Sequence, residues 1–588
     1  MKEKRIIYLI MGVSSILILL IGITTAWFTW QSETNTNVTF EVSGLNITST
    51  NTEITGTLYP TMDKNNGVVE EFTIKQNNNI ATPVCANITL TLTTLPTELN
   101  HESFRYKIYN GTSLVGSGNF ANTLEGETIT IATSQPITTT VSTYKLYIWI
   151  DGENYNNPLS MGGKTFLFKL GITANQQQNA CNPSIVEELN APELVNGMIP
   201  IKYDGTNWVK ASTNDWYDYN AKKWANAVMV TSGTRDTYMN ASTGTTISEE
   251  DILAYYVWIP RYKYQLFNVD STTIDPIEIQ IKFEEGIPNK SSGTANGEWL
   301  THPAFTLGTD ELEGIWVGKF STTGSAETPT IKPNLGMLTN QNVSTQFTTS
   351  QIFGTTTYLT SNGVSEVDAH MMKNIEWGAV AYLKQSKYGL GTTDIGLNNY
   401  NSSPYLTGCG AASGSEYSTT CNAYNTTDGM LASTTGNVYG IYDMSASTGT
   451  YVMGVMQDNT GTNTPMSGRS SSYNSGFTGK IYDSGNFTDF TGTPFPNTKY
   501  YDLYAYGTTY GDQTAYNRRI LGDATGEVHG WYGDYENFVD SNIPWFVRGV
   551  GYSDGYGGPA GAGVFSFNFD AGEPNPELVF RSVLAPGA

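Results

Sequence analysis

Short runs in which apolar and polar residues alternate recur along much of this chain. Examples are Val38–Val42, Ile88–Leu92 and Tyr144–Ile150, and Asn, Gly and Pro separate such runs. Successive side chains of a strand point to opposite faces, so a period of two predicts strands with one buried face. The pattern over residues 32–175 therefore predicts an antiparallel β-sandwich.

Length and charge limit the functions that this chain can have. Its 588 residues suggest several domains, at roughly 100 to 200 residues for each. Only 14% of the residues are charged, and 31 basic against 54 acidic residues give a net charge of -23. A surface that follows phosphates needs clustered cations, so nucleic acid is not expected as a partner.

The amino terminus carries a membrane signal. Residues 6–30 contain no charged residue, and about 20 apolar residues are enough for a helix to cross a bilayer. Basic residues precede this segment, which predicts a cytoplasmic amino terminus and an extracytoplasmic body at the cell surface. Thr24 and Ala26 also suit a signal cleavage site, so a secreted protein is the alternative to a membrane-anchored one.

Four cysteines are too few for a disulfide-dense scaffold, but an exported chain permits disulfide bridges. Cys409 and Cys421 lie close in sequence, and Cys85 and Cys181 flank much of the first domain. We expect these two pairs to form disulfides. Four free thiols are the alternative, because sequence alone does not fix the pairing.

A polar stretch at 176–179 begins a region, 176–250, that predicts a linker and a small β unit. Trp208, Trp216 and Trp224 recur every eight residues in it, after an Asp-Gly turn that favours a hairpin. Two interpretations remain open for these tryptophans. They form either the core of the unit or an aromatic platform for a sugar.

Two parts of the chain resemble known protein families. The anchor ending in Ala26–Phe28, with Tyr147–Glu153 and Phe166–Leu170 in the following domain, resembles camelysin and biofilm-matrix-fibre proteins. This similarity implies a structural module that faces outward and is able to associate laterally.

Residues from about 253 to 584 resemble the formylglycine-generating enzyme (sulfatase-modifying factor) family, which implies an α+β variant of the C-type lectin fold. Asn374–Tyr382 within this region predicts a short helix. The similarity rests on strings that occur in the family's order. These are Tyr256–Pro260, His302–Pro303, Gly314–Phe320, Asn374–Tyr382, Gly436–Ser445, Trp545–Gly549 and Phe580–Val583.

The catalytic residues of that family are missing. Its copper oxygenases need a cysteine pair between the Arg-Gly string and the final Phe-Arg string, and no cysteine lies between Gly549 and Phe580. The related iron enzymes use three histidines, whereas this chain has only four, which are scattered. We therefore predict no catalytic residue, no metal site and no cofactor, and interpret His302 and His370 as surface or packing residues.

Family members often bind calcium through a segment that contains Asn and Glu. The corresponding run here, Ser445–Tyr451, has no carboxylate. Because calcium prefers several hard oxygen ligands with carboxylates among them, this segment predicts a poor calcium site.

The carboxyl-terminal segment predicts a recognition face. Phe565, Phe567 and Phe569 alternate with polar residues, so the phenylalanines are expected in a core and the polar residues outside. The segment resembles the ligand face of the variable proteins of diversity-generating retroelements. Ordinary polar loop residues on a structural cap are the alternative. The candidate ligand-binding residues are Trp545, Tyr552, Ser553, Asp554, Tyr556, Ser566, Asn568, Asp570, Glu573 and Asn575.

The predicted fold class is mainly β with some α. The predicted parts are a transmembrane helix over 1–30, the sandwich over 32–175, the small β unit over 176–250 and a lectin-like head over 253–588. We expect a bacterial adhesin or receptor that binds a protein or carbohydrate ligand at the cell surface. A structural envelope or fibre protein is the alternative, and a formylglycine-generating-type oxidoreductase is the third possibility.

Overall fold

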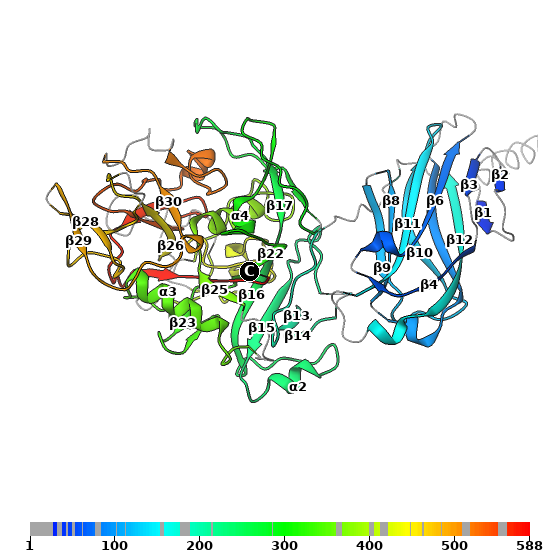
Figure 1. Ribbon diagram of the computed structural model, residues 1–588, viewed down its shortest axis with the longest axis horizontal. Helices are drawn as coiled ribbons and strands as arrows, with labels where there is room; N and C mark the ends of the chain where they lie inside the picture. The colour runs from blue at the N-terminus through cyan, green and yellow to red at the C-terminus, as the bar shows by residue number, and fades with distance from the viewer. Residues whose placement is uncertain are drawn as a thin grey trace, which may run out of the picture. The chain divides into compact units, whose positions relative to one another are not determined.

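The structure is a computed structural model, and it divides the chain into two compact units, residues 1–187 and 188–588 (Figure 1). Strands account for 40% of it and helices for 12%, which confirms a mainly β chain. The residues that the structure describes are 28–31, 38–42, 45–49, 53–61, 63–76, 84–101, 103–111, 113–152, 158–176, 181, 189–212, 216–284, 286–359, 367–398, 405–411, 421–446, 448–460, 464–483, 485–508, 518–550 and 561–587.

The first unit contains two sheets. One has the order β1-β12-β7-β10, with β4 also paired to β12, and the other has the order β2-β3-β6-β11-β8-β9, with β5 paired to β11. All pairings are antiparallel except that of β5 with β11. The strands are β1 Phe28–Gln31, β2 Val38–Val42, β3 Leu45–Ser49, β4 Glu53–Leu58, β5 Pro60–Thr61, β6 Val68–Gln76, β7 Val84–Thr94, β8 Phe104–Asn110, β9 Ser113–Asn119, β10 Thr128–Ile137, β11 Ser142–Asp151 and β12 Lys164–Gln176.

Alternating residues from both sheets fill one core. Ile88 and Leu90 of β7 are buried with Leu146 and Ile148 of β11, as a period of two requires. Phe104 of β8 also packs against aromatic rings of β12 in the other sheet. The predicted β-sandwich is thus confirmed, although it begins before residue 32, with β1, and the predicted bridge between Cys85 and Cys181 is present.

The predicted membrane helix lies mostly outside the described residues. Within the described ranges, no helix is long and apolar enough to cross a membrane. At its carboxyl end the prediction was too long, because Phe28, Thr29 and Trp30 belong to β1 and pair with β12. Aromatic residues and Thr favour strands, which accounts for this earlier boundary.

The second unit is built around a seven-stranded sheet with the order β14-β13-β15-β16-β22-β34-β25. Three of its strands come from the region that the sequence assigned to a separate small unit. The separation predicted at about residue 250 is therefore wrong, because β15 and β16 pair edge to edge. The strands are β13 Ile199–Tyr203, β14 Trp208–Lys210, β15 Asn226–Val230, β16 Ile252–Pro260, β22 Gly314–Gly318, β25 Asp368–Met371 and β34 Ser582–Ala585.

Smaller sheets complete this unit. The carboxyl-terminal strands join a five-stranded sheet with the order β30-β26-β31-β32, in which β33 also pairs with β26. Its strands are β26 Gly449–Met456, β30 Asp502–Tyr504, β31 Trp545–Arg548, β32 Phe567–Asp570 and β33 Leu578–Phe580. The remaining strands are β17 Tyr262–Gln265, β18 Ile281–Phe283, β19 Trp299–Thr301, β20 Thr306–Leu307, β21 Asp310–Glu311, β23 Thr323–Gly324, β24 Pro329–Thr330, β27 Met466–Gly468, β28 Gly479–Asp483 and β29 Asn486–Phe490.

The helices are α2 Arg235–Met239, α3 Val343–Gln351 and α4 Asn374–Lys384, and α4 confirms the predicted helix. Every residue of α4 is buried. The Glu376 carboxylate accepts a hydrogen bond from the backbone N–H of Lys373 at 2.8 Å, which caps the helix start. Gly378 lets the helix approach the carbonyl of Gly522, because a Cβ there would lie 1.9 Å from that oxygen.

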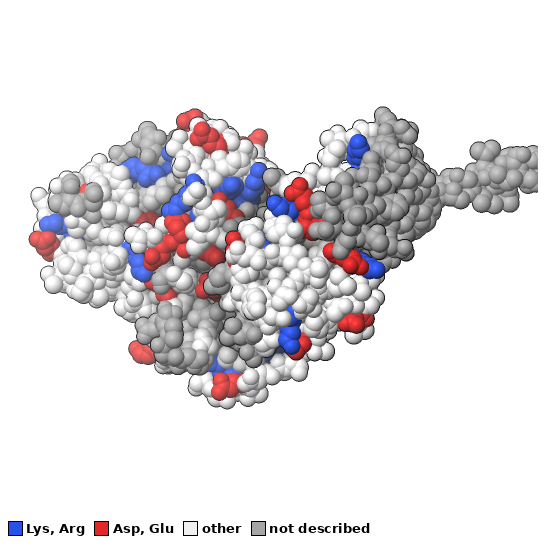
Figure 2. All heavy atoms as spheres, turned by 45° about the vertical axis from the view of Figure 1, so that its right-hand side comes forward, with Lys and Arg blue, Asp and Glu red and all other residues white. Residues whose placement is uncertain are grey.

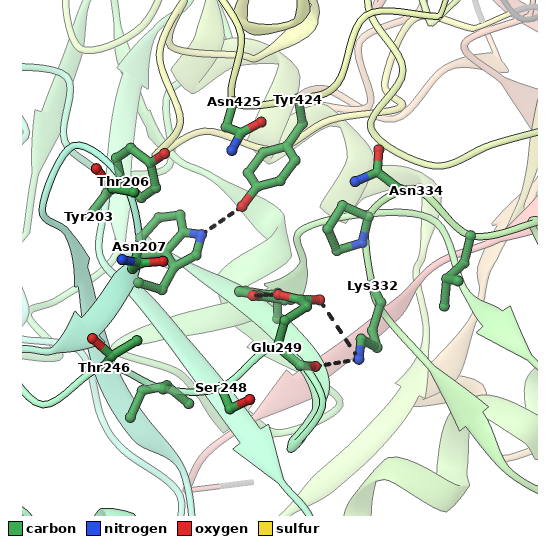
Figure 3. A pocket seen from close by; sticks show the side chains of 15 residues that line it. Tyr203, Thr206, Asn207, Thr246, Ser248, Glu249, Lys332, Asn334, Tyr424 and Asn425 are labelled. Atoms are coloured by element: carbon green, nitrogen blue, oxygen red, sulfur yellow. Dashed lines mark hydrogen bonds and ion pairs between the residues drawn. The ribbon is translucent and has the colours of Figure 1, made fainter.

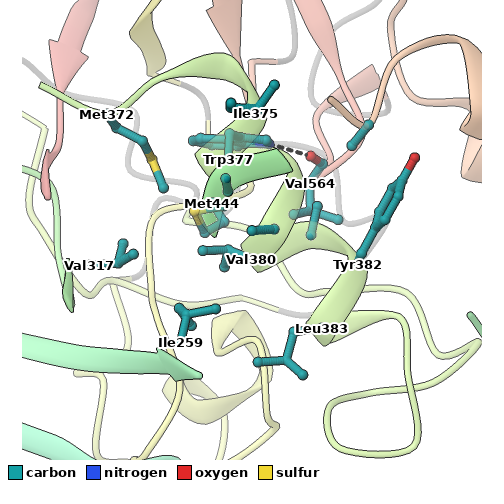
Figure 4. Close-up of a cluster of buried hydrophobic side chains, with 14 of the residues drawn as sticks. Ile259, Val317, Met372, Ile375, Trp377, Val380, Tyr382, Leu383, Met444 and Val564 are labelled. Atoms are coloured by element: carbon teal, nitrogen blue, oxygen red, sulfur yellow. Dashed lines mark hydrogen bonds between the residues drawn. The ribbon is translucent and has the colours of Figure 1, made fainter. Parts of the chain in front are cut away.

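Segments that are distant in sequence meet around α4 (Figure 4). Ile259 of β16, Val317 of β22 and Trp377 of α4 belong to the same buried cluster. The Trp377 indole N–H donates to the Val564 carbonyl at 2.8 Å. Several of the strings on which the family resemblance rests therefore contribute to one core.

Arg548 at the end of β31 joins these segments. Its guanidinium is fully buried and donates to Asn374 Oδ1 and to the carbonyls of Asp523, Ala524 and Ser566, at 2.8 to 3.1 Å. Burial lowers the pKa of Arg548 to about 10, and the nearby Asp523 opposes this shift. The side chain thus stays charged at neutral pH and links α4 to the carboxyl-terminal strands.

Candidate functional site

The structure corrects the predicted row of outward polar residues in the carboxyl-terminal segment. Phe565 and Phe567 are buried as expected, but Ser566 and Asn568 are buried too. Ser566 donates to the Val550 carbonyl at 2.6 Å and so serves the fold. The expected outward orientation is therefore wrong at these two positions.

The other predicted contacts divide into three groups. Trp545 is fully buried, and its indole N–H donates to the Ser467 carbonyl at 3.1 Å. Asp570, Glu573 and Asn575 are partly exposed. Tyr552, Ser553, Asp554 and Tyr556 lie outside the described residues.

Asp570 holds the end of the segment in place. Its carboxylate accepts hydrogen bonds from the Tyr451 hydroxyl at 2.5 Å, the Gly572 N–H at 3.2 Å and the Asn575 amide at 3.5 Å. Burial, with the nearby Asp570 carboxylate, raises the pKa of Glu573 to about 7. A ligand role for these three residues stays a prediction.

The two central histidines contact protein groups, as the packing interpretation predicts. His302 lies 2.9 Å from the Gly522 carbonyl, and burial lowers its pKa to about 3. His370 contacts Asp368 and Glu376, each at 2.9 Å. Among the described residues, no group of three or more His, Cys, Asp or Glu is placed to hold a metal ion.

A pocket of about 650 Å³ opens on the second unit (Figure 3). Four separate segments form its walls, and most of the lining side chains are polar or aromatic. The lining residues are Tyr203, Thr206, Asn207, Trp208, Thr246, Ile247, Ser248, Glu249, Tyr255, Lys332, Pro333, Asn334, Leu335, Tyr424 and Asn425.

The β13–β14 hairpin forms one wall. The Asp204 carboxylate accepts from the backbone N–H groups of Thr206 and Asn207 at 2.8 and 2.7 Å, and Gly205 adopts the φ of +105° that the turn needs. This turn leaves the side chains of Thr206 and Asn207 exposed beside the pocket.

Aromatic rings form the floor. Trp208, Trp216 and Trp224 are all buried, which confirms the core interpretation of these three residues. Trp208 also lines the pocket, where its indole N–H donates to the Tyr424 hydroxyl at 2.9 Å. The Tyr203 ring meets Trp208 edge to face, with 5.4 Å between the ring centres.

The two charged lining residues neutralise each other. The Lys332 ammonium donates to the Glu249 backbone carbonyl at 2.5 Å and lies 3.7 Å from the Glu249 carboxylate. The other carboxylate oxygen of Glu249 accepts from the Tyr255 hydroxyl. The pocket therefore offers a lining without net charge.

The predicted bridge between Cys409 and Cys421 is present and braces two walls. Upstream of Cys409, the Thr407 carbonyl accepts from the N–H of Asn334 at 2.9 Å. Downstream of Cys421 come the lining residues Tyr424 and Asn425. The disulfide thus holds the segment that supports Asn334 beside the segment that presents Tyr424.

Most of this pocket was not predicted from the sequence. Trp208 was predicted as a notable residue, but the amides at Asn207, Asn334 and Asn425 were not. A signal was present, because Asn207–Trp208 and Tyr424–Asn425 each place an amide beside an aromatic residue. No family model matches the chain, and a search of curated proteins returns no match.

Proposed function

We propose that this chain is a non-catalytic recognition protein that acts outside the cell and binds its ligand in the pocket of the second unit. The observation that carries the proposal is the lining of that pocket. Aromatic rings and hydrogen-bonding side chains from four segments converge there, as in sites that fix a ligand by contact area and by a few oriented polar groups.

Location outside the cell is supported by two features. The uncharged segment at 6–30 suits a membrane anchor, and the disulfides Cys85–Cys181 and Cys409–Cys421 are of the kind that persists in oxidising compartments. The surface is also compatible with a soluble outer domain. On the face shown in Figure 2, acidic and basic side chains are interspersed over a mostly uncharged surface.

For the second unit we propose a variant of the C-type lectin fold. The support is the convergence of the family-like strings on one sheet and one core. Tyr256–Pro260 lies in β16, which pairs with β22, and β22 pairs with β34 near the end of the chain.

The proposal is tested by filling the pocket. Full-length protein is applied to arrays of cell-surface proteins and glycans, and the Ser248→Trp variant is compared with Ser471→Trp. Ser248 lines the pocket, whereas Ser471 is exposed elsewhere in the same unit. We expect Ser248→Trp alone to lose binding. Equal binding by both variants would place the ligand elsewhere, and the partly exposed Glu573 and Asn575 would be substituted next.

A structural envelope or fibre protein is the alternative, with the first unit performing the assembly. Because β13, β14 and β15 belong to the sheet of the second unit, the deletion that separates the two functions removes residues 188–588. Assembly that survives this deletion, together with loss of ligand binding, would assign the two functions to different units.

A further inference from the structure

We infer that the ligand of the pocket is an uncharged carbohydrate, which narrows the proposed function and rests on it. Three amide side chains carry the inference. Asn207, Asn334 and Asn425 lie on three sides of the pocket (Figure 3). All three are exposed, and within the described residues none of their side chains makes a hydrogen bond with the protein.

Backbone hydrogen bonds hold two of these asparagines in position and leave their side chains for a ligand. The backbone N–H of Asn207 is bound by Asp204, and that of Asn334 by the Thr407 carbonyl. An amide side chain offers two donors and a carbonyl acceptor within one planar group. Neighbouring hydroxyls of a sugar ring also donate and accept, so one amide satisfies two hydroxyls at once.

Tyr424 adds a directed donor at the floor. Its hydroxyl oxygen accepts from the Trp208 indole, so the hydroxyl hydrogen is available to a ligand oxygen. The side chains of Tyr203 and Leu335 provide apolar surface beside it. A sugar ring, with polar edges and apolar faces, matches this combination of amides and apolar surface.

The charges of the pocket lining and of the whole chain disfavour a charged ligand. Among the described residues that line the pocket, only Glu249 and Lys332 are charged, and they contact each other. An acidic sugar or phosphate would find no unpaired cation among these described lining residues, while the chain as a whole carries a net charge of -23 and repels anions. An uncharged polyhydroxyl ligand avoids both costs.

The inference is tested on arrays that present neutral oligosaccharides of hexoses and N-acetylhexosamines, their sialylated and sulfated counterparts, and peptides. Full-length protein is compared with Asn207→Ala, Asn334→Ala and Asn425→Ala. Asn289→Ala is the matched control, because Asn289 is exposed in the same unit and does not line the pocket. We expect binding to neutral oligosaccharides, at least tenfold weaker in each pocket variant and unchanged in the control.

Two results would overturn the inference. One is a preference for sialylated or sulfated chains or for peptides. The other is binding to neutral oligosaccharides that the three pocket variants leave unchanged. If Ser248→Trp abolishes binding to a protein ligand while no neutral sugar binds, the carbohydrate assignment fails and the proposed function stands. If Ser248→Trp changes no binding at all, the pocket itself is excluded and both fail.

Discussion

The Tyr424 hydroxyl accepts a hydrogen bond from the Trp208 indole at 2.9 Å, across 216 positions of sequence. Both side chains are almost fully buried, at 6% and 4% exposure. This bond joins the β13–β14 hairpin to the loop that follows Cys421, so the floor of the pocket is made by two distant segments. The geometry of the pocket therefore depends on the tertiary fold of the second unit.

Tyr424→Phe is predicted to weaken both stability and binding. The substitution leaves the buried Trp208 N–H without its acceptor, which costs about 1–3 kcal/mol of unfolding free energy. Urea unfolding of full-length protein, followed by near-ultraviolet circular dichroism, measures the loss. Tyr59→Phe is the control because Tyr59 is 68% exposed, and it should change stability little. Equal stabilities of the two variants would contradict a structural role for the bond.

The disulfide at the pocket is predicted to support binding. Replacing Cys409 and Cys421 with Ser should lower the stability of the second unit by about 2–4 kcal/mol and reduce ligand affinity, because two walls lose their link. Replacing Cys85 and Cys181 is the control, since that bridge lies in the first unit. The thermal stability of both double variants is measured by differential scanning calorimetry, and their ligand affinity is measured alongside it. A loss of affinity only in the control pair would refute the bracing role.

His370 predicts a pH dependence of stability. Burial opposes its charge, but Glu376 and Asp368 outweigh this and raise the pKa of His370 to about 9. The ion pairs of protonated His370 therefore contribute to the free energy of unfolding. This contribution is complete below the unfolded pKa of about 6.5 and is lost as pH rises through 9. The stability difference between wild type and His370→Gln should therefore shrink between pH 7 and pH 10 in urea titrations. A constant difference would show that His370 is neutral in the folded protein.

Arg548→Ala is predicted to be strongly destabilising. The substitution leaves one side-chain oxygen and three backbone carbonyl oxygens in the core without their hydrogen-bond donor. The free energy of unfolding is therefore expected to fall by at least about 3 kcal/mol. Arg548→Lys should restore only part of it, because an ammonium does not span the same acceptors. The exposed Arg469→Ala should stay within about 0.5 kcal/mol. Thermal unfolding of the three variants ranks them, and similar midpoints would rule out the linking role.

Regular patterns were sufficient to predict part of the fold. Alternation over residues such as Ile88, Leu90 and Leu92 predicted the sandwich, because one face of each strand meets the core and the other meets water. The helix predicted over Asn374–Tyr382 is α4, and both predicted cysteine pairs form bridges.

The same rule failed where both faces of a sheet are covered. All residues of β26 and β31 are buried, so the neighbouring Ser566 and Asn568 do not meet water even though they alternate with Phe. The boundary near 250 failed for a related reason, because β15 completes the sheet of the next segment. Pairing between distant strands determines both the burial of these residues and the extent of the sheet, and such pairing cannot be predicted from local sequence.

The pocket was hidden for the same reason. Asn207, Asn334 and Asn425 are ordinary polar residues in sequence, and only the turn at Asp204, the pairing with Thr407 and the bridge at Cys421 bring them around one cavity. Their common property, an amide side chain with no hydrogen-bond partner among the described residues, is visible only in three dimensions.

The most direct test measures the Kd of full-length protein for the neutral oligosaccharide that binds best on the array, by isothermal titration calorimetry. Wild type, Asn425→Ala and the control Asn289→Ala are compared. Recognition in this pocket predicts a Kd at least tenfold higher for Asn425→Ala, about 1.4 kcal/mol, and an unchanged Kd for Asn289→Ala. The same Kd for all three proteins would contradict it.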